Sequence, residues 1–206
     1  MAVELNQKDT RALLQEIPEV YNTQINDVLL TALVDVLAPW SQQESVCLDL
    51  EGHGREELFE DIDLSRTVGW FTSIFPVVLK RGHPAHPGEL LKTVKEQLRQ
   101  IPLRGIGYGL LRYLSDNEEI RQGLGESLDP EVAFNYLGQF DQVIPSDARW
   151  TGNGVSGGAN RHPRGKQPYL VAINALVMDG EPERTLNLRG EPLKEEKEET
   201  KEATDV

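Results

Sequence analysis

Residues 51–56 read Glu-Gly-His-Gly-Arg-Glu, the stretch of this chain best suited to chemistry. They directly follow an alternating apolar segment, and strand ends are where open α/β sheets present functional groups. The glycines leave room for a ligand to approach the backbone. A Glu51 carboxylate held near apolar walls would have a raised pKa and could act as a general base. Alternatively, Glu51 pairs with Arg55 and ties down a turn, and the sequence leaves both interpretations open.

Asn135 and Tyr136 form a second candidate pair in the middle of an expected strand over residues 131–140. Neighbouring strand residues face opposite sides of a sheet, so one can address a cleft while the other packs. A buried Tyr hydroxyl needs a hydrogen-bond partner and could donate to a developing oxyanion. A core tyrosine with a satisfied hydroxyl is the alternative.

Other chemistries find little support in the residue spacing. The four histidines are scattered without metal-ligand spacing, and a single Cys excludes both an intrachain disulfide framework and a cysteine-built metal site. The serines lack a nucleophile-elbow context, and the Gly-rich residues 106–109 match neither a P-loop nor a dinucleotide fingerprint. We therefore expect no metal and no cofactor of the chain's own.

The elements that must position these residues alternate between helices and strands. Three- and four-residue apolar spacing predicts helices over residues 25–37, 87–100 and 108–115. Period-two patterns predict strands over 45–50 and 131–140, a strand ending near Leu79, and an interior last strand over 169–178. Residues 150–166 are rich in glycine and predict a long loop. The expected class is α/β, with a mixed sheet flanked by helices.

Composition narrows the range of partners. The 206-residue chain has a formal net charge of −13, which disfavours nucleic acid and anionic membrane surfaces. No apolar run reaches the roughly 18–20 residues of a membrane helix, and the first twenty residues lack a secretory pattern. A cytoplasmic protein is the expectation. We expect one folded unit over residues 1–182 and a charged, disordered tail over 183–206.

Five ordered motifs together resemble the C-terminal lobe of the epimerization domains of nonribosomal peptide synthetases, within the condensation-domain superfamily. They begin at Tyr21 (Tyr-Asn-Thr-Gln-Ile-Asn-Asp-Val-Leu-Leu), Glu51 (Glu-Gly-His-Gly-Arg-Glu), Arg66 (Arg-Thr-Val-Gly-Trp-Phe-Thr), Gly105 (Gly-Ile-Gly-Tyr-Gly) and Phe134 (Phe-Asn-Tyr-Leu-Gly). The second and third look like the epimerization branch, because peptide-bond-forming relatives usually differ there. The resemblance covers about residues 9–180.

The resemblance implies one lobe of a two-lobed fold like that of chloramphenicol acetyltransferase. It also implies inversion of the α-carbon of an aminoacyl or peptidyl thioester, held on the phosphopantetheine arm of a peptidyl carrier protein. Glu51 would be the acid/base carboxylate, Arg55 would orient Glu51 or its neighbours, and Asn135 and Tyr136 would line the same cleft.

The family's His-His-x-x-x-Asp-Gly motif, which lies on the N-terminal lobe, has no counterpart in this chain. We therefore expect the chain to be inactive alone and to need that lobe as a partner. Two alternatives to epimerization remain: a non-catalytic carrier-protein-binding lobe and a peptide-bond-forming condensation lobe.

Overall fold

The computed structural model describes residues 2–56, 58–125, 128–139, 168–179 and 184–192. They build a six-stranded sheet with the strand order β1-β6-β5-β4-β2-β3. The strands are β1 (Ala2–Leu5), β2 (Ser45–Gly52), β3 (Ser73–Lys80), β4 (Val132–Gln139), β5 (Val171–Asp179) and β6 (Arg184–Pro192). Pairing is parallel between β2 and β4 and between β4 and β5, and antiparallel in the other pairs. The predicted mixed sheet is confirmed.

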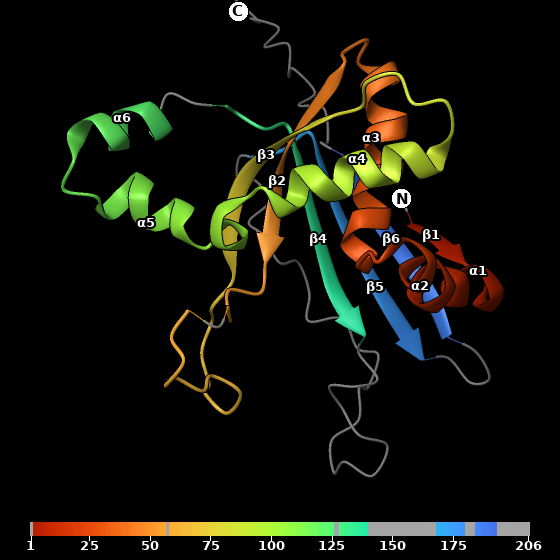
Figure 1. Cartoon of the computed structure of the whole chain (residues 1–206), viewed down its shortest axis with the longest axis horizontal. Helices are drawn as coiled ribbons and strands as arrows, with labels where there is room; N and C mark the ends of the chain where they lie inside the picture. The colour runs from red at the N-terminus through yellow and green to blue at the C-terminus, as the bar shows by residue number, and fades with distance from the viewer. Residues whose placement is uncertain (1, 57, 126–127, 140–167, 180–183, 193–206) are drawn as a thin grey trace, which may run out of the picture.

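Helices flank this sheet (Figure 1). They are α1 (Gln7–Arg11), the π-helix η1 (Ala12–Glu16), α2 (Ile17–Tyr21), α3 (Ile25–Trp40), α4 (Pro87–Arg99), the 3-10 turn η2 (Pro102–Gly105), α5 (Gly107–Leu114) and α6 (Glu118–Gly125). In Figure 1, α3 and α4 lie in front of the sheet, while α5 and α6 extend to the side of β3. The helices predicted over residues 25–37, 87–100 and 108–115 are confirmed as α3, α4 and α5.

The core lies between the sheet and the pair α3 and α4. Leu30 and Val34 of α3, Val94 of α4, Leu48 of β2 and Phe134 of β4 are essentially inaccessible to water. Val46, Leu48 and Leu50 are buried while the residues between them are only partly so, as the period-two pattern predicted. Apolar burial of this kind is the main stabilising contribution to the fold.

Hydrogen bonds from neighbouring residues satisfy both ends of α3. Gln24 is the N-cap, and its backbone N–H donates to Oδ2 of Asp27 at 2.8 Å. Asn22 ends α2 in the left-handed conformation, with φ of 49°. Pro39 lies inside the last turn of α3. The Ser41 hydroxyl donates to the Leu37 carbonyl at 2.9 Å and so helps to satisfy this helix end.

The prediction of a disordered tail over residues 183–206 is wrong for residues 184–192, which form strand β6. Strand β5 is interior, as predicted, but it is not the last strand, because β6 pairs with it over nine residue pairs. Residues 184–192 therefore belong to the sheet and not to a disordered tail. Their charged residues and prolines hide an alternation in which Leu186 and Leu188 are separated by polar residues. The loop predicted over residues 150–166 and the rest of the tail, 193–206, lie outside the described residues.

Candidate active site

Glu51 and Asn135 come together because β2 and β4 are parallel neighbours. Asp49 pairs with Ala133 and Leu50 with Phe134, so the next step along both strands sets Glu51 beside Asn135. The Asn135 Nδ2 donates to Oε2 of Glu51 at 2.7 Å. This is the length of a strong, charge-assisted hydrogen bond. The carboxyl end of β2 and the middle of β4 thus hold the carboxylate in one orientation.

Burial changes the acidity of Glu51. The side chain is half-buried, and loss of solvation raises the pKa of its carboxyl group above the ordinary value. A carboxylate with a raised pKa is a better proton acceptor than an ordinary one. Glu51 therefore has the electrostatic character expected of a general acid/base.

A groove of about 830 Å³ opens beside this pair, and we call it the Glu51 groove. Its sheet wall carries Glu51, Asn135 and Tyr136, and its helical wall carries Asp27 of α3 and Arg99 of α4. Apolar side chains also border it, namely Leu30, Leu50, Phe75, Leu98 and Ile101. The groove thus combines apolar side chains with amide and charged groups, which suits it to a polar organic group next to a base.

Tyr136 occupies the opposite face of β4 from Asn135. It packs against the hydrophobic core and is half-buried, yet it still borders the Glu51 groove. The two residues thus reach the same groove from different faces of one strand.

Arg55 is turned toward the loop that follows it rather than toward Glu51. Its guanidinium donates to the backbone oxygens of Leu64 at 2.9 Å and Gly69 at 3.4 Å, and lies 4.3 Å from the centre of the Phe71 ring. No ion pair joins Arg55 to Glu51, both of which the structure describes. The alternative that Glu51 pairs with Arg55 to fix a turn is therefore wrong: Arg55 fixes the turn with backbone oxygens.

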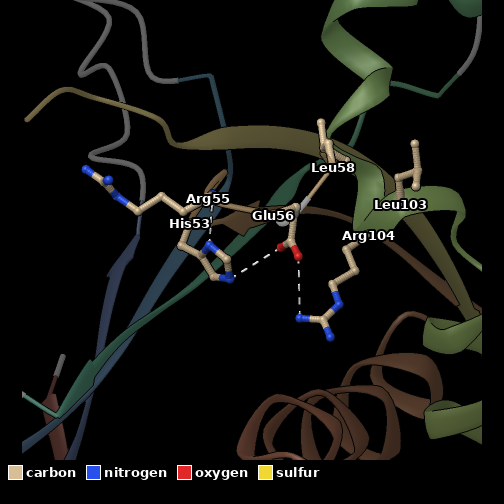
Figure 2. A pocket seen from close by; sticks show the side chains of 6 residues that line it. All are labelled: His53, Arg55, Glu56, Leu58, Leu103 and Arg104. Carbon is tan, nitrogen blue, oxygen red and sulfur yellow. Dashed lines mark hydrogen bonds and ion pairs between the residues drawn. The ribbon is translucent and has the colours of Figure 1, made fainter. Parts of the chain in front are cut away.

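A second charged cluster borders the groove and was not assigned from the sequence (Figure 2). The Glu56 carboxylate lies 3.3 Å from Nε2 of His53 through one oxygen and 3.5 Å from the Arg104 guanidinium through the other. The backbone N–H of Arg55 donates to Nδ1 of His53 at 2.9 Å, which leaves the proton of a neutral imidazole on Nε2, toward Glu56. His53 and Glu56 belong to the motif at residues 51–56, but no local signal pointed to Arg104.

The described residues contain neither a cluster of metal ligands nor a helix that could span a membrane. Within those residues, no three His, Cys, Asp or Glu side chains gather closely enough to hold an ion. Among the helices of the same residues, none has both the length and the apolar character needed to cross a lipid bilayer.

The family of the chain follows from comparison with known proteins. A family model described as the condensation domain matches residues 1–186. The chain belongs to the condensation domain family. Among curated relatives, a linear gramicidin synthase of Brevibacillus parabrevis is 48% identical over 173 residues, which are 84% of this chain and 2% of that protein. Gramicidin S synthase 1 of Brevibacillus brevis is 37% identical over 203 residues, which are 95% of this chain and 18% of that protein.

A solved structure extends the comparison within the condensation domain family. The epimerization domain from the third module of tyrocidine synthetase B superposes with a TM-score of 0.78 at 35% identity. The match covers 93% of this chain and 42% of that one. The chain thus spans less than half of that domain and a small part of the two gramicidin synthases. The sheet flanked by helices is the arrangement that it shares with this condensation-family structure.

Proposed function

We propose that this chain forms part of an epimerization domain of a nonribosomal peptide synthetase. The domain inverts the α-carbon of an aminoacyl or peptidyl thioester from L to D. The observation that carries the proposal is Glu51, a half-buried carboxylate with a raised pKa in a groove, oriented by Asn135. The similarity to the tyrocidine epimerization domain supports the same assignment.

The chemistry requires a base, stabilisation of negative charge, and a group that returns the proton. An α-proton beside a thioester is weakly acidic, so its removal needs a positioned base of suitable pKa. We assign that proton transfer to Glu51. Asn135 holds the Glu51 carboxylate, and Tyr136 is our candidate donor to the oxygen on which charge develops. Arg55 acts as a positioning residue through the loop it fixes.

The partners follow from the substrate. We propose a peptidyl carrier protein that brings the thioester on its phosphopantetheine arm, so that the arm is part of the substrate. A groove of about 830 Å³ has room for the thioester end of such an arm. The N-terminal lobe of the domain would supply the other face of the site. A cytoplasmic location belongs to the same proposal.

Two other functions would not invert the α-carbon. A lobe that only binds the carrier protein needs no proton transfer at Glu51. A peptide-bond-forming condensation domain transfers an acyl group to an amine and leaves the α-carbon unchanged. The first condensation domain of the CDA synthetase shares 14% sequence identity with this chain. A similarity at that level supports a common fold and does not support a common reaction.

The test uses a two-lobed domain in which residues 1–206 are joined to the N-terminal part of an epimerization domain. Deuterium uptake at the α-carbon of a carrier-bound L-aminoacyl thioester reports proton transfer. Replacing Glu51 by Gln should slow this uptake by roughly 10²- to 10⁴-fold, the usual contribution of a general acid/base. The matched control is Glu60→Gln, an equal change of charge at an exposed residue, which should leave uptake unchanged. A loss below about tenfold for Glu51→Gln would exclude Glu51 as the base.

A further inference from the structure

Both arginines that border the Glu51 groove are already paired within the chain. Arg99 donates to the backbone oxygen of Asn22 at 2.9 Å. Arg104 lies 3.5 Å from the Glu56 carboxylate (Figure 2). An acidic side chain on a ligand would have to displace one of these contacts before it could form an ion pair of its own.

The carboxylates of the groove are engaged in the same way. Asp27 is only 9% exposed, and its Oδ2 accepts a hydrogen bond from the backbone N–H of Gln24 at 2.8 Å. Glu56 lies 3.3 Å from His53 and is shared with an arginine. Glu51 is the group to which we assign proton transfer. A basic side chain on a ligand would therefore compete with an existing contact or with the base itself.

Two apolar side chains of the groove remain open to a ligand. Leu98, near the end of α4, and Ile101, just beyond it, border the groove, pack against the core and are only half-buried. Leu30 and Phe75 also border the groove but are almost inaccessible to water. A ligand in the groove would therefore cover apolar surface on Leu98 and Ile101 that now faces water, and such burial favours binding.

The backbone fixes the position of these two side chains. Leu98 and Ile101 are three residues apart, and the N–H of Ile101 donates to the carbonyl of Leu98 at 3.2 Å, so they lie next to each other at the end of the helix. The following turn, η2, contacts β3, and a Cβ at Gly105 would overlap the Phe75 ring there. In Figure 1, α4 crosses the front of the sheet and leads into η2 near β2 and β3. The apolar surface is thus held in place beside the sheet.

We propose that Leu98 and Ile101 contact the side chain of the residue whose α-carbon is inverted, so that the chain favours apolar amino acids over polar and charged ones. The inference rests on the proposed function, because it names the substrate class for the same groove. The α-carbon must lie within reach of Glu51 for its proton to be removed. A polar side chain on that carbon would lose water against the two apolar residues without gaining a partner there.

The experiment measures binding to the whole chain by NMR chemical-shift titration at low salt. The probes are the ethylamides of N-acetyl-leucine, N-acetyl-asparagine and N-acetyl-lysine, all in the L form, in which a stable amide takes the place of the thioester. Leucine and asparagine side chains have nearly the same shape, so their comparison isolates polarity. We expect the leucine probe to bind roughly fivefold or more tightly than each of the other two probes, because its side chain buries apolar surface.

Variants assign the preference to the two residues. Leu98→Asn should abolish the preference for the leucine probe, whereas Leu98→Met keeps an apolar side chain of similar volume and should retain it. Ile101→Thr should weaken the preference, because it replaces apolar surface by a hydroxyl. The matched control is Leu110→Asn, the same change at a leucine of α5 that is 59% exposed, which should leave the preference intact.

Several results would overturn the inference. In the wild-type chain they are equal affinity for the leucine and asparagine probes, or tighter binding of the lysine probe than of the leucine probe. In the variants they are a preference that survives Leu98→Asn, or one that is lost in Leu98→Met or in Leu110→Asn. The wild-type comparison needs no variant, so a misfolded variant cannot hide the answer. Failure of the Glu51→Gln exchange test would refute the proposed reaction while leaving the side-chain preference measurable, so the two failures can be told apart.

Discussion

Asn135 donates a 2.7 Å hydrogen bond to the Glu51 carboxylate across 84 positions of the chain. The bond depends on the parallel pairing of β2 and β4, since only their register sets these residues side by side. It also leaves the Oδ1 of Asn135 directed away from Glu51, because an amide presents its donor and its acceptor on different sides. The carboxylate is thus oriented by a neutral partner rather than by a cation.

The first prediction concerns this bond. Asn135→Leu should raise the pKa of Glu51 further, because a hydrogen bond donated to a carboxylate favours its charged form. The measurement is an NMR titration of the Glu51 side-chain carboxyl carbon. Tyr169→Phe removes a 2.7 Å bond to Asp49 on the same strand and should leave the Glu51 titration in place. A fall in the pKa of Glu51 in Asn135→Leu would contradict the assigned role.

The second prediction concerns stability and pH. Burial raises the pKa of Glu51 above 4.5, so the folded state holds this proton more tightly than the unfolded chain does. The tighter binding of this proton adds to the free energy of unfolding below pH 4.5, and this stabilisation is lost as pH rises through the folded-state pKa of Glu51. Glu51→Gln should raise the free energy of unfolding at about pH 8 relative to about pH 4, as measured by urea denaturation. Glu60→Gln should show a smaller change between these pH values.

The third prediction concerns Gly54. Its φ is 67°, and a Cβ there would overlap the carbonyl oxygen of Phe71. Gly54→Ala should lower the free energy of unfolding by at least about 2 kcal/mol, since strain and a steric clash combine. Gly82 has a similar φ of 62° but open space around it, so Gly82→Ala should cost only about 1 kcal/mol. Equal losses in the two variants would mean that the contact with Phe71 relaxes freely.

The fourth prediction concerns the loop that Arg55 holds. Arg55→Lys keeps the charge but cannot reach two carbonyl oxygens while lying flat on a ring. Amide hydrogen exchange over residues 64–71 should become several-fold faster, because local opening becomes easier. Arg66→Lys in the same loop serves as control, since Arg66 is exposed. Unchanged exchange in Arg55→Lys would show that the loop holds without this clamp.

The fifth prediction concerns self-association. Val68 and Trp70 are 99% and 91% exposed, and exposed apolar groups of this size favour association. The net charge of −13 opposes it by repulsion, which salt screens beyond about 8–10 Å. Sedimentation should therefore show association that grows with ionic strength and decreases in Trp70→Ser. Trp40→Ser, at another exposed tryptophan, should have the smaller effect, and a monomer at every salt concentration would contradict this prediction.

The sequence could predict elements whose burial is periodic. Helices α3 and α4 and strands β2 and β5 each place apolar residues on a regular face, and the structure buries those faces. The segments α1, η1 and α2 are each five residues long and change helix type twice, so no single period describes them. Residue type alone also fails to distinguish nearby aromatic residues, because Phe75 is 5% exposed whereas Trp70 is almost fully exposed.

The candidate site was predictable only in part. The position of Glu51 at the end of a strand followed from local alternation, and so did the opposite faces of Asn135 and Tyr136. Their meeting in one groove depends on strand order, which local patterns do not determine. Arg104 was missed for a related reason, because its placement results from a left-handed turn that the types of residues 103 and 104 do not favour.

The pairing of β1 with β6 joins the first described strand to the last at one border of the sheet. Four residues, Ala2–Leu5, therefore shield part of the hydrogen-bonding edge of a nine-residue strand. An unshielded strand of that length is a template on which other chains can add. Displacing β1 would therefore expose the backbone donors and acceptors of β6 that now pair with Ala2–Leu5, without touching the groove.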